Sequence, residues 1–184
     1  MKQKGFTLIE LLVVISIIGL LASVVLVALN GARSKARDAK RVMDLKQLQT
    51  ALEMYYNQYG SYPYASEGGT WANAWANFSA CLKTGQGCLS DGTGNIANYQ
   101  PVVVNVPEDP QYNSGTGLPT YYYNTYLSDP ACPRGSAYRI AVQLETNSPA
   151  LSNSTGGSFY NNNGLCNPAN KWFCVGSGVC TDFN

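Results

Sequence analysis

A single carboxylate, that of Glu10, lies inside a long apolar run near the N-terminus. The 24 residues from Phe6 to Leu29 include only four polar side chains, those of Thr7, Glu10, Ser16 and Ser23. A charge at the centre of a membrane-spanning helix costs about 2.5–3.5 kcal/mol, and less near the helix end. We therefore expect Glu10 to have a cationic partner. A partner for one acid in one helix indicates assembly with other molecules.

The other reactive side chains are six cysteines, at Cys81, Cys88, Cys132, Cys166, Cys174 and Cys180. An even number in a chain with an export signal predicts disulfides that form in an oxidising compartment. No Cys-x-x-Cys occurs, which disfavours a zinc knuckle. We expect Cys81 to pair with Cys88, because they are close in sequence and a glycine-containing loop separates them. The other four cysteines allow three pairings, among which the sequence does not choose.

No catalytic group is evident. The chain has no histidine, which excludes Ser-His-Asp and Cys-His pairs and histidine metal sites. Carboxylates are sparse, and no pair of them is suited to acid–base catalysis. The formal charge of +1 gives no reason to expect nucleic-acid binding. We expect a protein that is not an enzyme, and a surface hydrolase anchored by its export segment is a distant alternative.

One long helix must position Glu10. The apolar run would be roughly 36 Å long as a helix, enough to cross a hydrocarbon core of about 30 Å. The helical pattern continues to Tyr59 but becomes amphipathic, with an apolar face at Val42, Leu45, Leu48, Leu52, Tyr55 and Tyr59. Gly60 and Pro63 are expected to end the helix. The opposite face is expected to carry Arg33, Lys35, Arg37, Lys40 and Arg41.

This group of cations, directly after the apolar run, has two interpretations. It is either a solvated helix face, or a surface that attracts anionic lipid before assembly and pairs with neighbouring subunits afterwards. By the positive-inside rule alone the group would mark a cytoplasmic flank. The predicted disulfides instead place residues 30–184 outside the cytoplasm.

The rest of the chain is predicted to form a head, which gives an α+β fold with a small antiparallel sheet packed on the long helix. Residues 64–98 form a loop with a short helix at Trp71, Trp75, Phe78 and Leu82, either stapled by Cys81–Cys88 or serving as a subunit-contact or receptor-facing surface. Residues 99–145 form the sheet, with strand candidates at 101–106, 120–127 and 138–145. Residues 146–184 form a cysteine-rich C-terminal region with little regular period.

The run from Gly5 to Val14, Gly-Phe-Thr-Leu-Ile-Glu-Leu-Leu-Val-Val, resembles the class III leader junction of type IV pilins and pseudopilins. A short basic leader, a Gly–Phe junction and one acid at a fixed place carry the resemblance. Residues 48–63 resemble the helix end of G-type pseudopilins and the minimal pilins close to them. The resemblance covers residues 4–63. A secretory signal peptide explains this stretch less well, because the apolar run is too long and no cleavage site follows it. A plain membrane anchor leaves Glu10 unexplained.

The resemblance implies a pilin fold, whose leader, residues 1–5, a prepilin peptidase removes between Gly5 and Phe6. It also implies N-methylation of the new Phe6 amine and pairing of this amine with Glu10 of a neighbouring subunit. Such a pair sets axial register, since removing one buried partner costs about 3–5 kcal/mol.

Two glycines are implied as places where the long helix bends. Gly19 matches a position where helices of this family loosen in filaments. The proline that many relatives carry further on is absent, because residues 23–27 read Ser-Val-Val-Leu-Val. Gly31, which follows Asn30, is therefore the alternative site for a bend.

G-type pseudopilins bind calcium in a loop near residues 106–110, so the resemblance makes Glu108, Asp109 and Asp129 candidate calcium ligands. Turn formation explains the same acids, and no other cofactor is expected.

The expected function is that of a type IV pilus subunit. The cytoplasmic membrane would store it through residues 6–29, with residues 30–63 packed on the head. An assembly platform and its ATPase would then add it to a helical surface filament for adhesion, twitching motility or DNA uptake. The alternative is a G-type pseudopilin of a type II secretion system.

Overall fold

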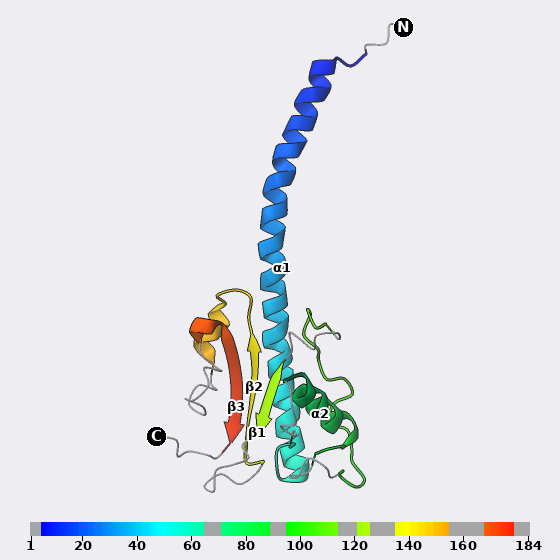
Figure 1. Cartoon of the computed structure of the whole chain (residues 1–184), viewed down its shortest axis with the longest axis vertical. Coiled ribbons are helices and arrows are strands. Elements are labelled where there is room, and N and C mark those ends of the chain that lie inside the picture. The colour runs from blue at the N-terminus through cyan, green and yellow to red at the C-terminus, as the bar shows by residue number, and fades with distance from the viewer. Residues whose placement is uncertain are drawn as a thin grey trace.

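The computed structural model describes residues 5–64, 71–88, 95–113, 121–125, 135–154 and 168–178. A long helix, α1 (Leu8–Tyr59), dominates the molecule, and its N-terminal part extends well beyond the head (Figure 1). Its C-terminal part packs beside a second helix, α2 (Trp71–Thr84), and a three-stranded antiparallel sheet. The fold is therefore α+β, as the sequence predicts.

Helix α1 is continuous over 52 residues, about 78 Å at ~1.5 Å per residue. It ends where expected, because Gly60 adopts a left-handed conformation with φ 73° and donates its N–H to the Tyr56 carbonyl at 2.8 Å. A glycine tolerates this conformation without the steric cost of a side chain. Gly19 and Gly31 both lie within the unbroken helix, and a Cβ at either position would meet no atom within 4 Å.

The sheet has the order β1-β2-β3, formed by β1 (Tyr122–Thr125), β2 (Ala137–Gln143) and β3 (Trp172–Gly178). Both pairings are antiparallel, and the central Ile140 lies opposite Tyr123 on one side and Val175 on the other. In the described residues before β3, the chain forms the short 3-10 helices η1 (Pro149–Asn153) and η3 (Pro168–Asn170). Six of the seven residues of β2 are buried, so this strand is covered on both faces.

The core joins α1 to the head. The apolar face predicted for α1 supplies Leu45, Leu48, Leu52 and Tyr55, all buried. They belong to one cluster with side chains of α2 and the sheet, including Phe78 and Ile140. Aromatic rings fill much of it, and Phe78 stacks on Tyr123 with ring centroids 3.8 Å apart. The short helix predicted around Trp75 and Phe78 is thus confirmed as α2.

The strand predicted at residues 101–106 is wrong. This segment is irregular, and its valines act separately: Val106 is buried whereas Val104 is 96% exposed. Pro101 and Pro107 flank the segment and carry no N–H to donate to a neighbouring strand. The valines other than Val104 anchor an irregular segment to the core. A run of β-branched residues is also typical of a strand, which is why the sequence pattern predicted one.

Strand β3 lies in the C-terminal region, in which the sequence shows little regular period. Its pairing with β2 explains why a glycine stands in it, since a Cβ at Gly176 would come within 2.6 Å of the Tyr138 carbonyl oxygen. Gly176 makes the sequence of β3 look less like a strand, although the close approach of β2 leaves room only for glycine at this position. The predicted strands at 120–127 and 138–145 are confirmed as the shorter β1 and as β2, respectively. Tyr121, Leu144 and Glu145 lie outside the strands, and residues 120, 126 and 127 lie outside the described part.

Candidate functional site

The start of α1 fixes the position of Glu10. Thr7 is the N-cap residue, and its hydroxyl oxygen accepts a hydrogen bond from the Glu10 backbone N–H at 3.3 Å. In return the Glu10 carboxylate accepts from the Thr7 backbone N–H at 2.8 Å and from its hydroxyl at 2.7 Å. This reciprocal arrangement is a capping box. The sequence analysis did not identify it, although the Thr-x-x-Glu spacing at 7–10 is its signature.

Residues 5–7 precede the helix, so the Gly5–Phe6 bond lies in non-helical chain. The side chain of Phe6 is 86% exposed, and Gly5 is exposed as well. A non-helical, accessible peptide bond is what a peptidase requires in order to bind and cut it. Cutting there would leave Thr7 and Glu10, and hence the capping box, intact. Residues 1–4 of the predicted leader lie outside the described part of the chain.

The apolar half of α1 has no cover. Each residue from Phe6 to Leu29 is exposed, and Leu8–Tyr59 is the helix in the described chain that is long and apolar enough to cross a membrane. A monomeric soluble protein rarely exposes an apolar patch of more than a few hundred Å². This surface therefore requires lipid or other apolar helices around it.

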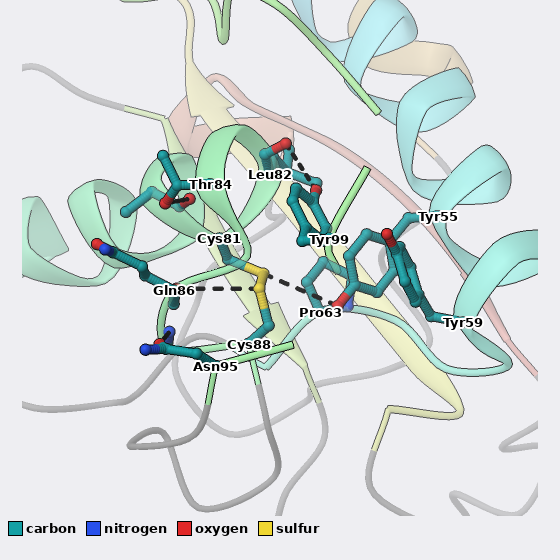
Figure 2. The surroundings of a disulfide bond; sticks show 12 residues. Tyr55, Tyr59, Pro63, Cys81, Leu82, Thr84, Gln86, Cys88, Asn95 and Tyr99 are labelled. Carbon is teal, nitrogen blue, oxygen red and sulfur yellow. Dashed lines mark hydrogen bonds between the residues drawn. A yellow bond between two sulfur atoms is a disulfide. The ribbon is translucent and has the colours of Figure 1, made fainter. Parts of the chain in front are cut away.

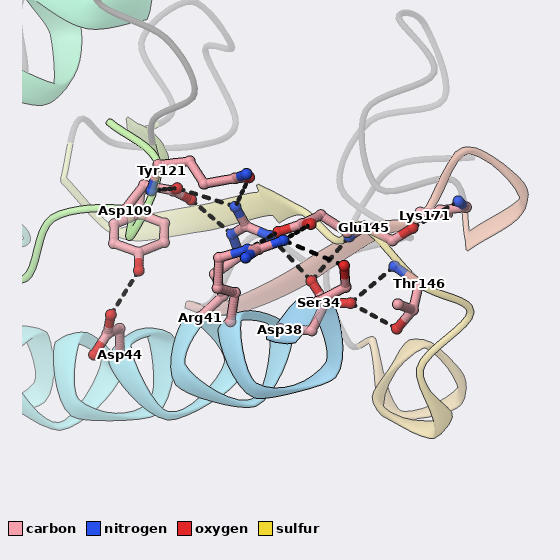
Figure 3. A network of polar contacts seen from close by, with 11 residues as sticks. Ser34, Asp38, Arg41, Asp44, Asp109, Tyr121, Glu145, Thr146 and Lys171 are labelled. Carbon is pink, nitrogen blue, oxygen red and sulfur yellow. Dashed lines mark hydrogen bonds and ion pairs between the residues drawn. The ribbon is translucent and has the colours of Figure 1, made fainter. Parts of the chain in front are cut away.

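Further along α1, Arg41 lies at the centre of a buried polar network that joins the helix to the head (Figure 3). Its guanidinium donates two hydrogen bonds to Asp109, at 2.7 and 3.0 Å. It also donates to Asp38, Glu145 and Gln111 at 3.0, 2.8 and 3.0 Å. We call this set the neck network; its members are Arg37, Asp38, Arg41, Asp109, Gln111, Glu145 and Thr146.

The loop after β2 completes the network. The Asp38 carboxylate accepts the backbone N–H groups of Glu145 and Thr146 at 2.9 and 2.8 Å, and the Thr146 hydroxyl at 2.6 Å. Glu145 also pairs with Arg37 through two hydrogen bonds. Residues more than 100 positions apart in the sequence are thus held together, and the network fixes the angle at which α1 leaves the head.

These contacts change the acidity of the carboxyls. The Arg37 hydrogen bonds, assisted by Arg41 and opposed by burial, lower the pKa of Glu145 to about 2. Burial by itself would raise the pKa of Asp38. The donors of Thr146, the Glu145 N–H and Arg41 outweigh it, so the pKa of Asp38 is lowered. Both groups therefore remain ionised in moderately acidic solution.

The prediction that the cations of residues 33–41 lie opposite the apolar face is wrong for two of them. Arg41 is 1% exposed and lies on the head side, and Arg37 is half-buried against Glu145. The reason is tertiary: Asp109 and Glu145 come from distant segments and supply the negative charge that a buried guanidinium needs. Arg33, Lys35 and Lys40 are exposed as predicted.

The calcium candidates do not form a site in the described chain. Both carboxylate oxygens of Asp109 are engaged by Arg41, which already supplies the positive charge there. Glu108 is exposed, and Asp129 lies outside the described residues. Within the described residues no three metal-binding side chains come together.

The expected disulfide between Cys81 and Cys88 is confirmed, with their Cα atoms 5.1 Å apart (Figure 2). It closes the turn after α2, where the Gly85 N–H bonds to the Cys81 carbonyl at 2.9 Å. Beside it Tyr99 donates its O–H to the Leu82 carbonyl at 2.7 Å and stacks on Tyr59 of α1. The disulfide thus secures the segment that packs against the end of α1.

Cys174 of β3 is also disulfide-bonded. The remaining cysteines lie outside the described residues: Cys132, Cys166 and Cys180.

Comparison with known proteins supports the resemblance. The family model described as the prokaryotic N-terminal methylation motif matches residues 1–26. The type II secretion system core protein G of Escherichia coli (strain K12) is 48% identical over 67 residues, which cover 36% of this chain and 46% of that protein. The corresponding protein of Klebsiella pneumoniae is 46% identical over 67 residues, 36% of this chain and 48% of that protein.

A type IV major pilin protein of Neisseria gonorrhoeae is 39% identical over 61 residues, which cover 33% of this chain and 37% of that pilin. The matches to the core G proteins span about half of their length. No solved structure matches this chain. The family model therefore covers the methylation motif and the first part of α1, and each of these relatives matches about a third of this chain.

Proposed function

We propose that this chain is a pilin, the structural subunit of a type IV pilus or a pilin-like filament. One observation carries the proposal: an uncovered apolar half-helix begins directly after an accessible Gly5–Phe6 bond and holds one carboxylate, Glu10, in its first turn. Lipid would cover this half before assembly, and the same half of other subunits would cover it afterwards. The head would then form the filament surface.

In this proposal a prepilin peptidase removes residues 1–5, and the Phe6 amine is methylated. The amine then meets Glu10 of the neighbouring subunit, so that two charges that are costly in an apolar environment neutralise each other. An assembly platform and an ATPase would supply the work of extraction from the cytoplasmic membrane. Residues 6–29 would form the filament core, with residues 30–63 and the head at 64–184 outside it. Adhesion, twitching motility or DNA uptake would follow from polymerisation.

A second candidate is a G-type pseudopilin of a type II secretion system. The identity to the core G proteins, 48% and 46%, is higher than the 39% identity to the pilin and favours this candidate. Six cysteines and a long head favour a surface pilin. Deleting the gene separates the two: loss of surface fibres supports the pilin, whereas loss of exoprotein secretion with fibres intact supports the pseudopilin.

Mass spectrometry of the mature protein tests the processing step, and we expect the chain to begin at N-methyl-Phe6. An intact Met1 in the mature protein would contradict the proposal.

The register step is tested by Glu10→Val in cells that also make wild-type subunits. We expect normal cleavage but no incorporation of the variant into filaments. Ser16→Val is the matched control, because it removes a polar group from the same apolar half. The Ser16 hydroxyl donates only to the Val13 carbonyl of its own helix. Normal incorporation of the Glu10 variant would show that this carboxylate does not set the register.

A further inference from the structure

The charged side chains of residues 30–47 are sorted by sign around α1. The two acids of this stretch, Asp38 and Asp44, are 2% and 6% exposed and face the head. Two of its six cations, Arg37 and Arg41, pair with head carboxylates. The other four are exposed and have no ion pair or hydrogen bond to any described residue: Arg33, Lys35, Lys40 and Lys46. The ionic groups that this stretch exposes are therefore all cationic.

Their distances from the apolar half differ. At ~1.5 Å per residue, Arg33 and Lys35 lie about 6 and 9 Å beyond Leu29 along the helix axis. Lys40 and Lys46 lie about 16 and 26 Å beyond it. The polar headgroup layer on each side of a bilayer is roughly 5–8 Å thick. With Leu29 at the edge of the hydrocarbon, the side chains of Arg33 and Lys35 reach the lipid phosphates, whereas the two distal lysines do not.

Arg33 and Lys35 precede the part of α1 that bonds to the described part of the head. Among the described residues, the first α1 side chains that bond to the head are those of Arg37 and Asp38, and Arg33 and Lys35 lie exposed on the helix before them. Being two residues apart, they project on roughly opposite sides of the helix. Each cation can therefore contact a different lipid.

We propose that Arg33 and Lys35 form a binding site for the phosphate groups of anionic phospholipids, on the outer side of the cytoplasmic membrane, before the subunit is assembled. The site rests on the proposed function, since that function supplies the membrane-stored form. It goes further by naming the lipid class and the two residues that select it.

A second copy of this chain fits the same cations poorly. In a parallel neighbour the stretch at the same level carries Asp38 and Asp44, and both are buried under that copy's own head. The exposed charges of that stretch of its helix are again cationic, and like charges repel. Anionic lipid supplies the opposite charge at the height where Arg33 and Lys35 lie.

The test measures lipid selectivity of the full-length mature protein in phosphatidylcholine bilayers. Spin-labelled phosphatidylglycerol or phosphatidylcholine is added, and electron paramagnetic resonance gives the fraction of each that the protein immobilises. We expect wild type to prefer phosphatidylglycerol about five-fold or more at low salt, because each cation near the surface contributes about a five-fold preference. Salt at 1 M should abolish most of this preference.

Two double variants of equal charge separate the site from a general charge effect. Arg33→Gln with Lys35→Gln should bring the preference close to one. Lys40→Gln with Lys46→Gln should leave it at the wild-type value, because these exposed lysines lie beyond the reach of the headgroups. An unchanged preference in the first variant, or an equal loss in the second, would overturn the proposal.

The outcomes also separate this proposal from the proposed function. A chain that does not remain in the bilayer, or that is not cleaved after Gly5, contradicts the function itself. A membrane-stored, correctly cleaved chain without lipid preference contradicts only the lipid site. If the first double variant keeps its lipid preference but no longer forms filaments, the two cations serve contacts between subunits, and the lipid site is wrong.

Discussion

Arg41 and Asp109 lie 68 positions apart in the sequence and form a two-bonded ion pair in which both side chains are almost fully buried. Arg41 belongs to the long helix and Asp109 to the irregular segment before β1. Burial of two charges offsets most of their attraction, so such a pair contributes less to net stability than to the uniqueness of an arrangement. Here it fixes one rotation of α1 relative to the head.

Removing the cation should be costly. In Arg41→Met the carboxylates of Asp38, Asp109 and Glu145 lose a shared partner, and we expect a loss of about 3–5 kcal/mol in the free energy of unfolding of the head. Urea denaturation of the detergent-solubilised protein, followed by near-ultraviolet circular dichroism of its tyrosines, measures this. Arg33→Met is the control, expected within about 0.5 kcal/mol of wild type because Arg33 is exposed. Equal stability of the two variants would show that the neck network does not hold the head.

Two buried tyrosines allow a comparison of the stability contributed by a hydrogen bond to a charged acceptor and by one to a neutral acceptor. Tyr121 donates its O–H to the Asp44 carboxylate at 2.6 Å, and Tyr123 donates to the Pro63 carbonyl at the same distance. Hydrogen bonds to charged groups contribute about 1.5–3 kcal/mol, against about 0.5–1.5 kcal/mol for neutral ones. We therefore expect Tyr121→Phe to destabilise the protein more than Tyr123→Phe in the same urea titration. The reverse order would refute this account.

The lowered pKa of Glu145 predicts a stability change at low pH. Its pKa is about 2 in the folded protein, against an ordinary value of 4.5. A lowered folded pKa contributes stability that is complete above the unfolded value and is lost as the pH falls towards the folded one. The melting temperature should therefore decline between about pH 4.5 and pH 2, and Glu145→Gln should decline less steeply over that window. Parallel curves for the two proteins would contradict the prediction.

Alanine substitutions at the two glycines of α1 should have different effects on helix stability and on filament assembly. A Cβ at Gly19 or Gly31 meets no atom within 4 Å, so Gly→Ala at either site should stabilise the helix by about 1 kcal/mol. If α1 must loosen at Gly19 in the filament, Gly19→Ala should reduce the number of filaments while Gly31→Ala does not. Counting filaments by negative-stain electron microscopy compares the variants. A loss of filaments in Gly31→Ala alone would indicate that the helix bends at Gly31 instead of Gly19.

Local patterns allowed the long helix to be predicted well. The spacing of Leu45, Leu48 and Leu52 follows from helical geometry alone, and Gly60 ends the helix because few other residues adopt its conformation. The Cys81–Cys88 disulfide is local in the same way, since the two cysteines are only seven positions apart in the sequence. Where a neighbour in sequence is also the neighbour in space, periodicity and residue type are sufficient.

Contacts between distant segments decided the rest. Strand β3 forms because β2 offers it an edge, and Val102 to Val104 are irregular, since none of the described strands pairs with them. The sequence determined the apolar half-helix, its lone Glu10 and the end of α1, because these depend on short-range periodicity and capping. Only the tertiary structure decided which cations of α1 are buried: it is the approach of Asp109 and Glu145 that makes burial of Arg41 electrostatically possible and leaves Arg33 and Lys35 exposed.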